Sequence, residues 1–172
     1  VILSGLGGND RLIGGADGDT LIGGANNDLL RGMGGNDTYL FDADQVLGDD
    51  VVDEAAGPAG GVDFLDFRET QTVGVTVDLS ITTQQTVHAT NLRLTFTSGA
   101  SVEYLAGGDR DDTLIGNGLY NAFIGGLGND IIRGGAGLNY LVETREDVVG
   151  HEEDDFTLAS TGATTASLAI GA

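Results

Sequence analysis

Apolar side chains recur at a fixed interval of nine residues in two stretches of the chain. In the first stretch Leu12, Leu21, Leu30 and Tyr39 each follow an aspartate by two positions, and glycine fills most of the positions before that aspartate. The residues around each apolar position are enough for one short strand, and a glycine-rich run ending in aspartate can form a tight turn. Two such units therefore close one coil of a solenoid, with the apolar side chain in its core.

The nine-residue units share the form Gly-Gly-x-Gly-x-Asp-x-apolar-x and fall into two blocks. The first block comprises Gly5–Ile13, Gly14–Ile22, Gly23–Arg31 and Gly32–Leu40. The second block aligns with it without a gap and comprises Gly107–Ile115, Gly116–Ile124, Gly125–Arg133 and Gly134–Val142. Eight units in two phased blocks are a specific signal for a repeat architecture, whereas one Gly-x-Gly-x-x-Asp would be weak.

Between the blocks, apolar and polar residues alternate with a period of two, in 73–81 and again in 92–96. This alternation, rich in Val and Thr, predicts strands, and no useful length of the chain has a helical period. Ser98–Ala106 resembles a decayed unit, with Glu103 and Leu105 at the acidic and apolar positions. We therefore expect an all-β chain throughout.

Four segments follow from these patterns. They are a first repeat block at 1–41, an acidic loop and strand-rich connecting segment at 42–106, a second block at 107–142, and an acidic loop and tail at 143–172. The acidic phrases at 42–54 and 143–155 are expected to be solvated loops, with additional cation ligands as the alternative.

Charge changes the picture, because the chain of 172 residues has a net charge of −20, 30 glycines, no cysteine and only seven basic side chains, all arginine. Nucleic acid is not expected as a partner, since phosphate binding needs a basic face and the seven arginines are scattered. Bound divalent cations would neutralise the acidic excess and replace the missing disulfides. The sequence has no apolar run of about 20 residues that would span a bilayer, and its first residues do not form a basic stretch followed by an apolar segment, the pattern of a signal peptide. We expect it to be part of a larger chain.

The stacked turns bring inward-facing carbonyls and carboxylates together. Such a set of oxygen ligands suits a hard cation, and calcium tolerates the mixture better than magnesium does. Calcium is therefore the expected cofactor and partner.

These units resemble the haemolysin-type, or RTX, calcium-binding nonapeptide repeat. The resemblance implies a parallel β-roll, or β-solenoid, with two calcium-binding blocks joined by a β-rich middle segment. It further implies that each calcium lies between the turns of units eighteen residues apart. Its ligands would be the carbonyls at positions two and four of the first turn and one and three of the second, with both position-six carboxylates.

The resemblance thus implies three sites with two aspartates each, and about three ions per chain. Site one takes Leu6, Gly8 and Asp10 with Gly23, Ala25 and Asp28. Site two takes Gly15, Asp17 and Asp19 with Gly32, Gly34 and Asp37. Site three takes Gly108, Arg110 and Asp112 with Gly125, Leu127 and Asp130.

A fourth pairing has amides at both position-six places and is expected to be weak or empty, because Asn offers an oxygen without charge. It takes Asn117, Leu119 and Asn121 with Gly134, Ala136 and Asn139. Some turns also carry other residues where the repeat has glycine, which puts them at risk of strain: Leu6, Asp17, Asn26, Met33, Arg110 and Leu119.

The function that the resemblance implies is a non-catalytic calcium-binding module of a secreted or cell-surface bacterial protein. Export would use a type I secretion channel, with folding outside the cell, and the tail Thr157–Ala172 would be part of a C-terminal secretion signal or an end strand. Two alternatives remain: an adhesion or carbohydrate-binding module with a polysaccharide or cell-surface partner, and an enzyme that acts on polysaccharides. Paired carboxylates can act as acid and base, but these aspartates are committed to turns, so no enzyme is expected.

Overall fold

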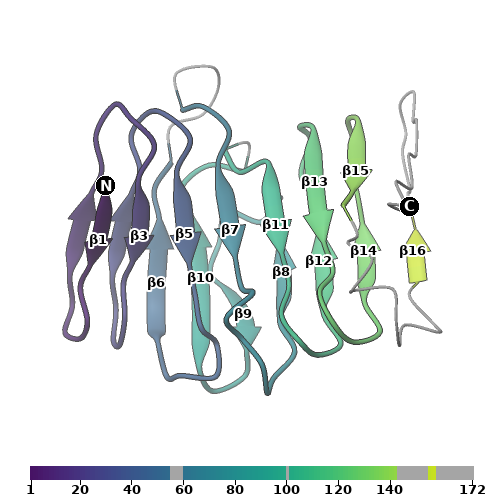
Figure 1. Cartoon of the computed structure of the whole chain (residues 1–172), viewed down its shortest axis with the longest axis horizontal. Coiled ribbons are helices and arrows are strands. Elements are labelled where there is room, and N and C mark those ends of the chain that lie inside the picture. The colour runs from purple at the N-terminus through teal and green to yellow at the C-terminus, as the bar shows by residue number, and fades with distance from the viewer. Residues whose placement is uncertain (55–59, 100, 143–154, 158–172) are drawn as a thin grey trace.

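The structure is a computed structural model that describes residues 1–54, 60–99, 101–142 and 155–157. Every regular element in these residues is a β-strand, and within them no helix is long and apolar enough to cross a membrane. The strands stack side by side along one long axis, as Figure 1 shows. The predicted all-β parallel roll is confirmed.

One face of the solenoid is a parallel sheet of seven strands that runs through both repeat blocks; we call it the long sheet. In spatial order its strands are β1 (Ile2–Ser4), β3 (Thr20–Ile22), β5 (Thr38–Leu40), β7 (Phe64–Asp66), β11 (Tyr104–Ala106), β13 (Asn121–Ile124) and β15 (Asn139–Leu141). Because β7 and β11 lie between β5 and β13, the two blocks share one continuous sheet.

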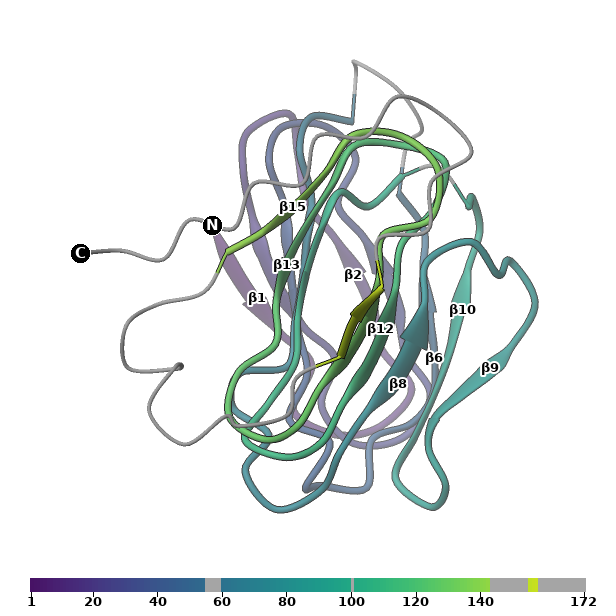
Figure 2. The same ribbon diagram turned by 90° about the vertical axis from the view of Figure 1, so that its right-hand side faces the viewer.

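The opposite face is divided into two shorter sheets. The first contains β2 (Arg11–Ile13), β4 (Leu29–Arg31), β6 (Gly48–Val52), β10 (Leu92–Phe96) and β9 (Gln85–His88). The second contains β8 (Thr76–Asp78), β12 (Thr113–Ile115), β14 (Ile131–Arg133) and β16 (Asp155–Thr157). Viewed along the axis, the long sheet and the two shorter sheets form the two sides of a flattened coil (Figure 2).

Columns of apolar side chains fill the space between the faces. In the long sheet the paired residues Leu21, Tyr39, Leu65 and Leu105 are all fully buried. They occupy the eighth position of the repeat or its equivalent, so each strand adds one side chain to a continuous core. Neighbouring residues of a strand point to opposite faces, so a three-residue strand turns only its middle side chain into the core. One strand per nine-residue unit therefore produces the nine-residue apolar period.

The connecting segment completes both short sheets. Strand β10 pairs in parallel with β6, β9 turns back antiparallel beside β10, and β8 begins the second sheet beside β12. The Gln85 side chain bridges the division, because its Oε1 accepts from the Asp78 amide and its Nε2 donates to the Asp78 carbonyl, both at 2.8 Å. The alternating residues therefore form strands as predicted. The predicted tail at 143–172 lies outside the described residues apart from β16.

Candidate metal centres

The position-six side chains form ladders along the edges of the solenoid. Along a ladder, the backbone amide of one position-six residue donates to the position-six side-chain oxygen of the next stacked turn. The Asp10 amide lies 2.7 Å from Asp28 Oδ1, and the Asp19 and Asp112 amides lie 2.8 Å from Asp37 Oδ1 and Asp130 Oδ1. The structure thereby brings together the two aspartates that the resemblance implied for each of sites one, two and three.

The second oxygen of several of these carboxylates is left without a partner. Oδ2 of Asp10, Asp28, Asp37 and Asp50 is buried and accepts no hydrogen bond in the described structure. A buried polar atom without a partner costs about 1–3 kcal/mol, and more when it is charged. These oxygens therefore fit a ligand that would bind them, and a cation meets the need.

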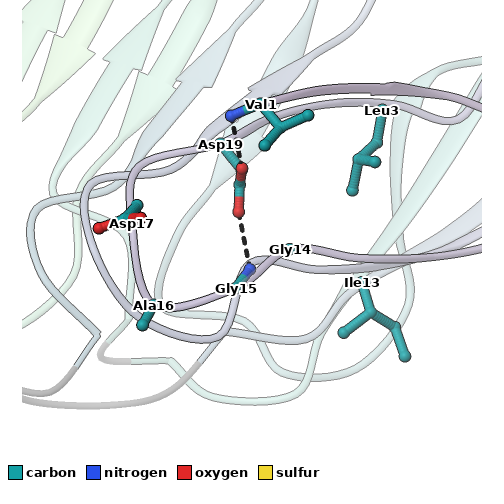
Figure 3. Close-up of a pocket in the computed structure, with 8 residues that line it drawn as sticks. All are labelled: Val1, Leu3, Ile13, Gly14, Gly15, Ala16, Asp17 and Asp19. Carbon is teal, nitrogen blue, oxygen red and sulfur yellow. Dashed lines mark hydrogen bonds and ion pairs between the residues drawn. The ribbon is translucent and has the colours of Figure 1, made fainter.

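Two turns satisfy this oxygen within their own backbone. Oδ2 of Asp19 accepts from the Gly15 amide and Oδ2 of Asp112 accepts from the Gly108 amide, each at 2.7 Å. Figure 3 shows the Asp19 carboxylate between the Gly15 amide and the Val1 amino group. Val1 stands eighteen residues before Asp19, where the preceding turn of the ladder belongs, and its nitrogen lies 2.6 Å from Asp19 Oδ1.

The first glycine of several units lies directly beside converging oxygens. A β-carbon built on Gly5 would lie 2.6 Å from both Asp10 Oδ2 and the Gly23 carbonyl oxygen. At Gly14 the same point lies 2.5 Å from Asp19 Oδ2 and from the Gly32 carbonyl oxygen. A carboxylate of one turn and a carbonyl of the next thus share one small space, and this pair of donors suits calcium.

The predicted carbonyl ligands lie in directly stacked turns. The position-two carbonyls of Leu6, Gly15 and Gly108 accept from the position-three amides of the next turn at 3.0–3.1 Å; those amides belong to Ala25, Gly34 and Leu127. The position-four residues of stacked turns also pack closely. A β-carbon at Gly35, Gly128 or Gly137 would lie within 3 Å of backbone atoms of Asp17, Arg110 or Leu119 respectively. Each predicted set therefore occupies two neighbouring turns.

The residues that replace glycine in the turns fall into two groups by their φ angle. Leu6, Asn26 and Met33 adopt positive φ angles of 67°, 81° and 85°. The other three, Asp17, Arg110 and Leu119, avoid positive φ. Positive φ is costly for Leu and Met, so the first block stores backbone strain in two of its turns.

The asparagine pairing is held by hydrogen bonds. The backbone amide of Asn121 donates to Asn139 Oδ1 at 3.1 Å, and Asn121 Oδ1 accepts from the backbone amide of Asn117 at 2.9 Å. Asn121 Nδ2 donates to the carbonyls of Val102 and Glu103 in the preceding turn, at 3.2 and 3.3 Å. The side-chain amide thus supplies a donor to two carbonyl oxygens, so these turns stack through hydrogen bonds between neutral groups.

The connecting segment continues both ladders, and the sequence predicted this place for Glu103 but not for Asp50 or Asp63. The Asp28 amide donates to Asp50 Oδ1 at 2.8 Å, and the Asp37 and Asp63 amides donate to Asp63 Oδ1 and Glu103 Oε2 at 2.9 Å. Each acidic residue is followed after two positions by a buried apolar side chain, Val52, Leu65 and Leu105. The pattern of an acidic residue two positions before an apolar residue is therefore visible in the sequence, but the intervals between stacked acidic residues are irregular here.

The expectation that the acidic phrase at 42–54 is a solvated loop is wrong for its final part. Asp50 is only 1 % exposed and Glu54 only 4 % exposed. The reason is that Asp50 takes the position-six place of a stacked turn and β6 carries the chain across the solenoid to Glu54. The corresponding phrase at 143–155 lies outside the described residues, apart from the backbone of Asp155.

Burial shifts the titration of these carboxyl groups. Desolvation raises the pKa of Asp50 and Asp112 to about 7 and that of Asp63 to about 8, against hydrogen bonds that lower it. The pKa values of Asp28 and Asp37 are also raised, again chiefly by burial. Without a bound cation, burial therefore favours the protonated form of Asp50, Asp63 and Asp112.

This shift predicts that acid partly replaces calcium. The folded pKa values of Asp50 and Asp112 lie above the ordinary value of 3.8, so the native state binds more protons and its free energy of unfolding falls as pH rises from about 4 to about 7. We expect the calcium-free chain to have more β-signal in far-UV circular dichroism at pH 5 than at pH 8. Asp50→Asn should flatten this dependence, and a β-signal that grows with pH would contradict it.

The family model of the RTX calcium-binding nonapeptide repeat, which spans four copies, matches residues 4–39, 97–118 and 121–142. The second match begins before Ser98–Ala106 and so includes the decayed unit. A search of curated proteins found no match to the chain.

Proposed function

Because the chain carries RTX calcium-binding nonapeptide repeats, we propose that it is a non-catalytic module that binds calcium in its stacked turns and folds when calcium is bound. The proposal is carried by one observation, the buried carboxylate oxygens of the ladders that accept no hydrogen bond. Bound calcium would supply the positive charge that these oxygens lack. Sites one to three would each use the two aspartates that the ladders bring together.

The module would serve a secreted or cell-surface bacterial protein. Ligand that binds only the folded state stabilises it by mass action, so the fold would be unstable where calcium is scarce and stable where it is abundant. The chain would therefore pass a type I secretion channel unfolded and fold outside the cell. The net charge of −20 supports this, since the acidic chain repels itself until cations neutralise it.

The number of bound ions tests the assignment of the sites. Asp112→Asn removes one of the two charged ligands of site three, so isothermal titration calorimetry with calcium should count one ion fewer than for the wild type. The double variant Asn121→Asp with Asn139→Asp restores two carboxylates to the fourth pairing and should count one ion more. It should also be less stable in chelator, because Asn121 would lose its donor to Val102 and Glu103. Unchanged counts in both variants would contradict the assignment.

A second candidate function is adhesion to polysaccharide, and one observation favours it. Four aromatic side chains, which we call the aromatic row, line the outer face of the long sheet: Phe64, Tyr104, Tyr120 and Tyr140. Neighbouring ring centroids lie 6.2, 6.3 and 5.0 Å apart, and Tyr104 and Tyr120 are 37 % and 40 % exposed. The row concentrates three of the four tyrosines of the chain on one surface.

Aromatic faces can bind the apolar faces of sugar rings, so a glycan array with the calcium-loaded chain tests this candidate. Binding that is lost in Tyr104→Ala with Tyr120→Ala, while the circular dichroism spectrum is unchanged, would support adhesion. If the chain binds no glycan, the calcium-folded module is the one candidate function that is left.

A further inference from the structure

Three buried carboxylates meet where the first repeat block joins the connecting segment. Asp37 precedes β5, Glu54 follows β6 and Asp63 precedes β7. Ligand oxygens of the three lie within 4.8 Å of one another, and the residues are 1 %, 4 % and 1 % exposed. Like charges this close, in a site with little water, repel strongly unless a counter-charge is present.

One of these oxygens is buried, unpartnered and directed into the group. Asp37 Oδ2 accepts no hydrogen bond. A β-carbon built on Gly32 would lie within 2.6 Å of Asp37 Oδ2, Glu54 Oε2 and Tyr39 Oη, so the three oxygens converge on one side of that glycine. The Asp37 amide also holds Asp63 Oδ1 at 2.9 Å, which keeps the third carboxylate at the same turn.

The hydrogen bonds that Tyr39 makes within the group bring no positive charge to it. The Tyr39 hydroxyl donates to Glu54 Oε2 and accepts from the Gly32 amide, but the phenol is neutral. Arg31, at the end of the adjacent strand β4, forms its ion pair with Asp53. A divalent cation would balance most of the formal charge of the three carboxylates.

The group shares Asp37 with site two but differs from the repeat sites in its composition. Asp37 and Asp63 are 26 residues apart in sequence, whereas the position-six pairs of the repeats are 18 apart. Glu54 comes from the end of a strand on the opposite face and has no counterpart in the nonapeptide. Three carboxylates thus stand where a repeat site has two carboxylates and several carbonyls.

We propose that Asp37, Glu54 and Asp63 bind one calcium ion at the junction of the first block and the connecting segment. The choice of calcium rests on the proposed function. The 4.8 Å limit on the oxygen separations is about twice a calcium–oxygen distance of roughly 2.3–2.6 Å, so one ion can contact all three. With one carboxylate more than a repeat site, the junction site should fill at lower calcium. The ion would link residues that flank β5, β6 and β7.

Calorimetry with calcium tests the site through Glu54→Gln, which keeps the shape of the side chain and removes its charge. We expect this variant to bind one ion fewer than the wild type and to lose the tightest phase of the titration. Asp53→Asn is the matched control, because it removes a negative charge from the neighbouring residue without touching the group. An equal count in Glu54→Gln and the wild type would overturn the proposal. A wild type that binds no calcium would instead overturn the proposed function itself.

Terbium luminescence tests the same site with all three carboxylates intact. Tyr39 lies beside the proposed ion, whereas the other three tyrosines lie in the aromatic row. With excitation of tyrosine, the first equivalent of terbium should give strong emission in the wild type and at least a fivefold weaker emission in Tyr39→Phe. Calorimetry should count the same number of calcium ions in both. Equal emission from the two proteins would overturn the proposal even if Glu54→Gln failed to fold.

Discussion

Removal of calcium by a chelator is expected to unfold most of the chain, and return of calcium is expected to refold it cooperatively. A repeat site with a dissociation constant of about 0.1 mM gains roughly 2.7 kcal/mol at about 10 mM calcium. Three such sites give about 8 kcal/mol, which is comparable with the whole stability of a typical domain at about 5–15 kcal/mol. Without the ions, the carboxylates of each ladder repel and the glycine-rich backbone has much conformational entropy to lose.

Far-UV circular dichroism during a calcium titration measures this directly. The β-signal should rise with a sigmoidal dependence on calcium, and magnesium at the same concentration should not replace it, because magnesium demands a smaller octahedral site. A chain that is already folded in chelator and ignores calcium would contradict the prediction. Adhesion by the aromatic row on a metal-independent solenoid would then be the better account.

The substitution Gly107→Ala should disable site three and destabilise the second block. The new β-carbon would lie 2.1 Å from Asp112 Oδ2 and 2.4 Å from the Gly125 carbonyl oxygen, and the second of these is backbone that cannot turn aside. Strain of this kind costs about 1–3 kcal/mol. Because both oxygens belong to the predicted ligand set, the loss of the ion should add roughly the 2.7 kcal/mol of one site.

The matched control is Gly118→Ala, in the adjacent unit of the same block. A β-carbon there meets nothing within 4 Å, and Gly118 does not have positive φ. Thermal unfolding in saturating calcium should therefore show a lower midpoint for Gly107→Ala and almost no change for Gly118→Ala. Equal midpoints for Gly107→Ala and the wild type would show that the turn opens at little cost. That result would contradict the close packing of Gly107 against Asp112 and Gly125.

The nine-residue period was enough to predict the elements of both blocks. An aspartate that ends a glycine-rich run specifies the turn, and the apolar residue two positions later specifies which face of the strand is buried. Leu21, Leu30, Tyr39 and Leu114 accordingly lie in the core. The constant offset of eighteen residues also predicted which aspartates meet across stacked turns, as the hydrogen bond from the Asp10 amide to Asp28 demonstrates. The ligand sets themselves stay predictions.

The same period could not predict the junction, because the connecting segment keeps the stack while changing the length between its coils. Asp28 meets Asp50 after 22 residues, Asp37 meets Asp63 after 26, and Asp63 meets Glu103 after 40. A repeat search with a fixed offset misses such pairs. Burial of Glu54 was missed for a related reason, since its place depends on where β6 crosses the solenoid.

The sequence by itself determined the coil, its apolar core and the aspartate pairs within each block, because all of these follow from local periodicity. Only the tertiary structure decided that one long sheet joins the two blocks and that Asp37, Glu54 and Asp63 meet. It also gathered Tyr104, Tyr120 and Tyr140 into one row. The long sheet between the blocks and the group of Asp37, Glu54 and Asp63 join residues separated by segments of irregular length, so the stacking of coils, and not their spacing along the chain, brings them together.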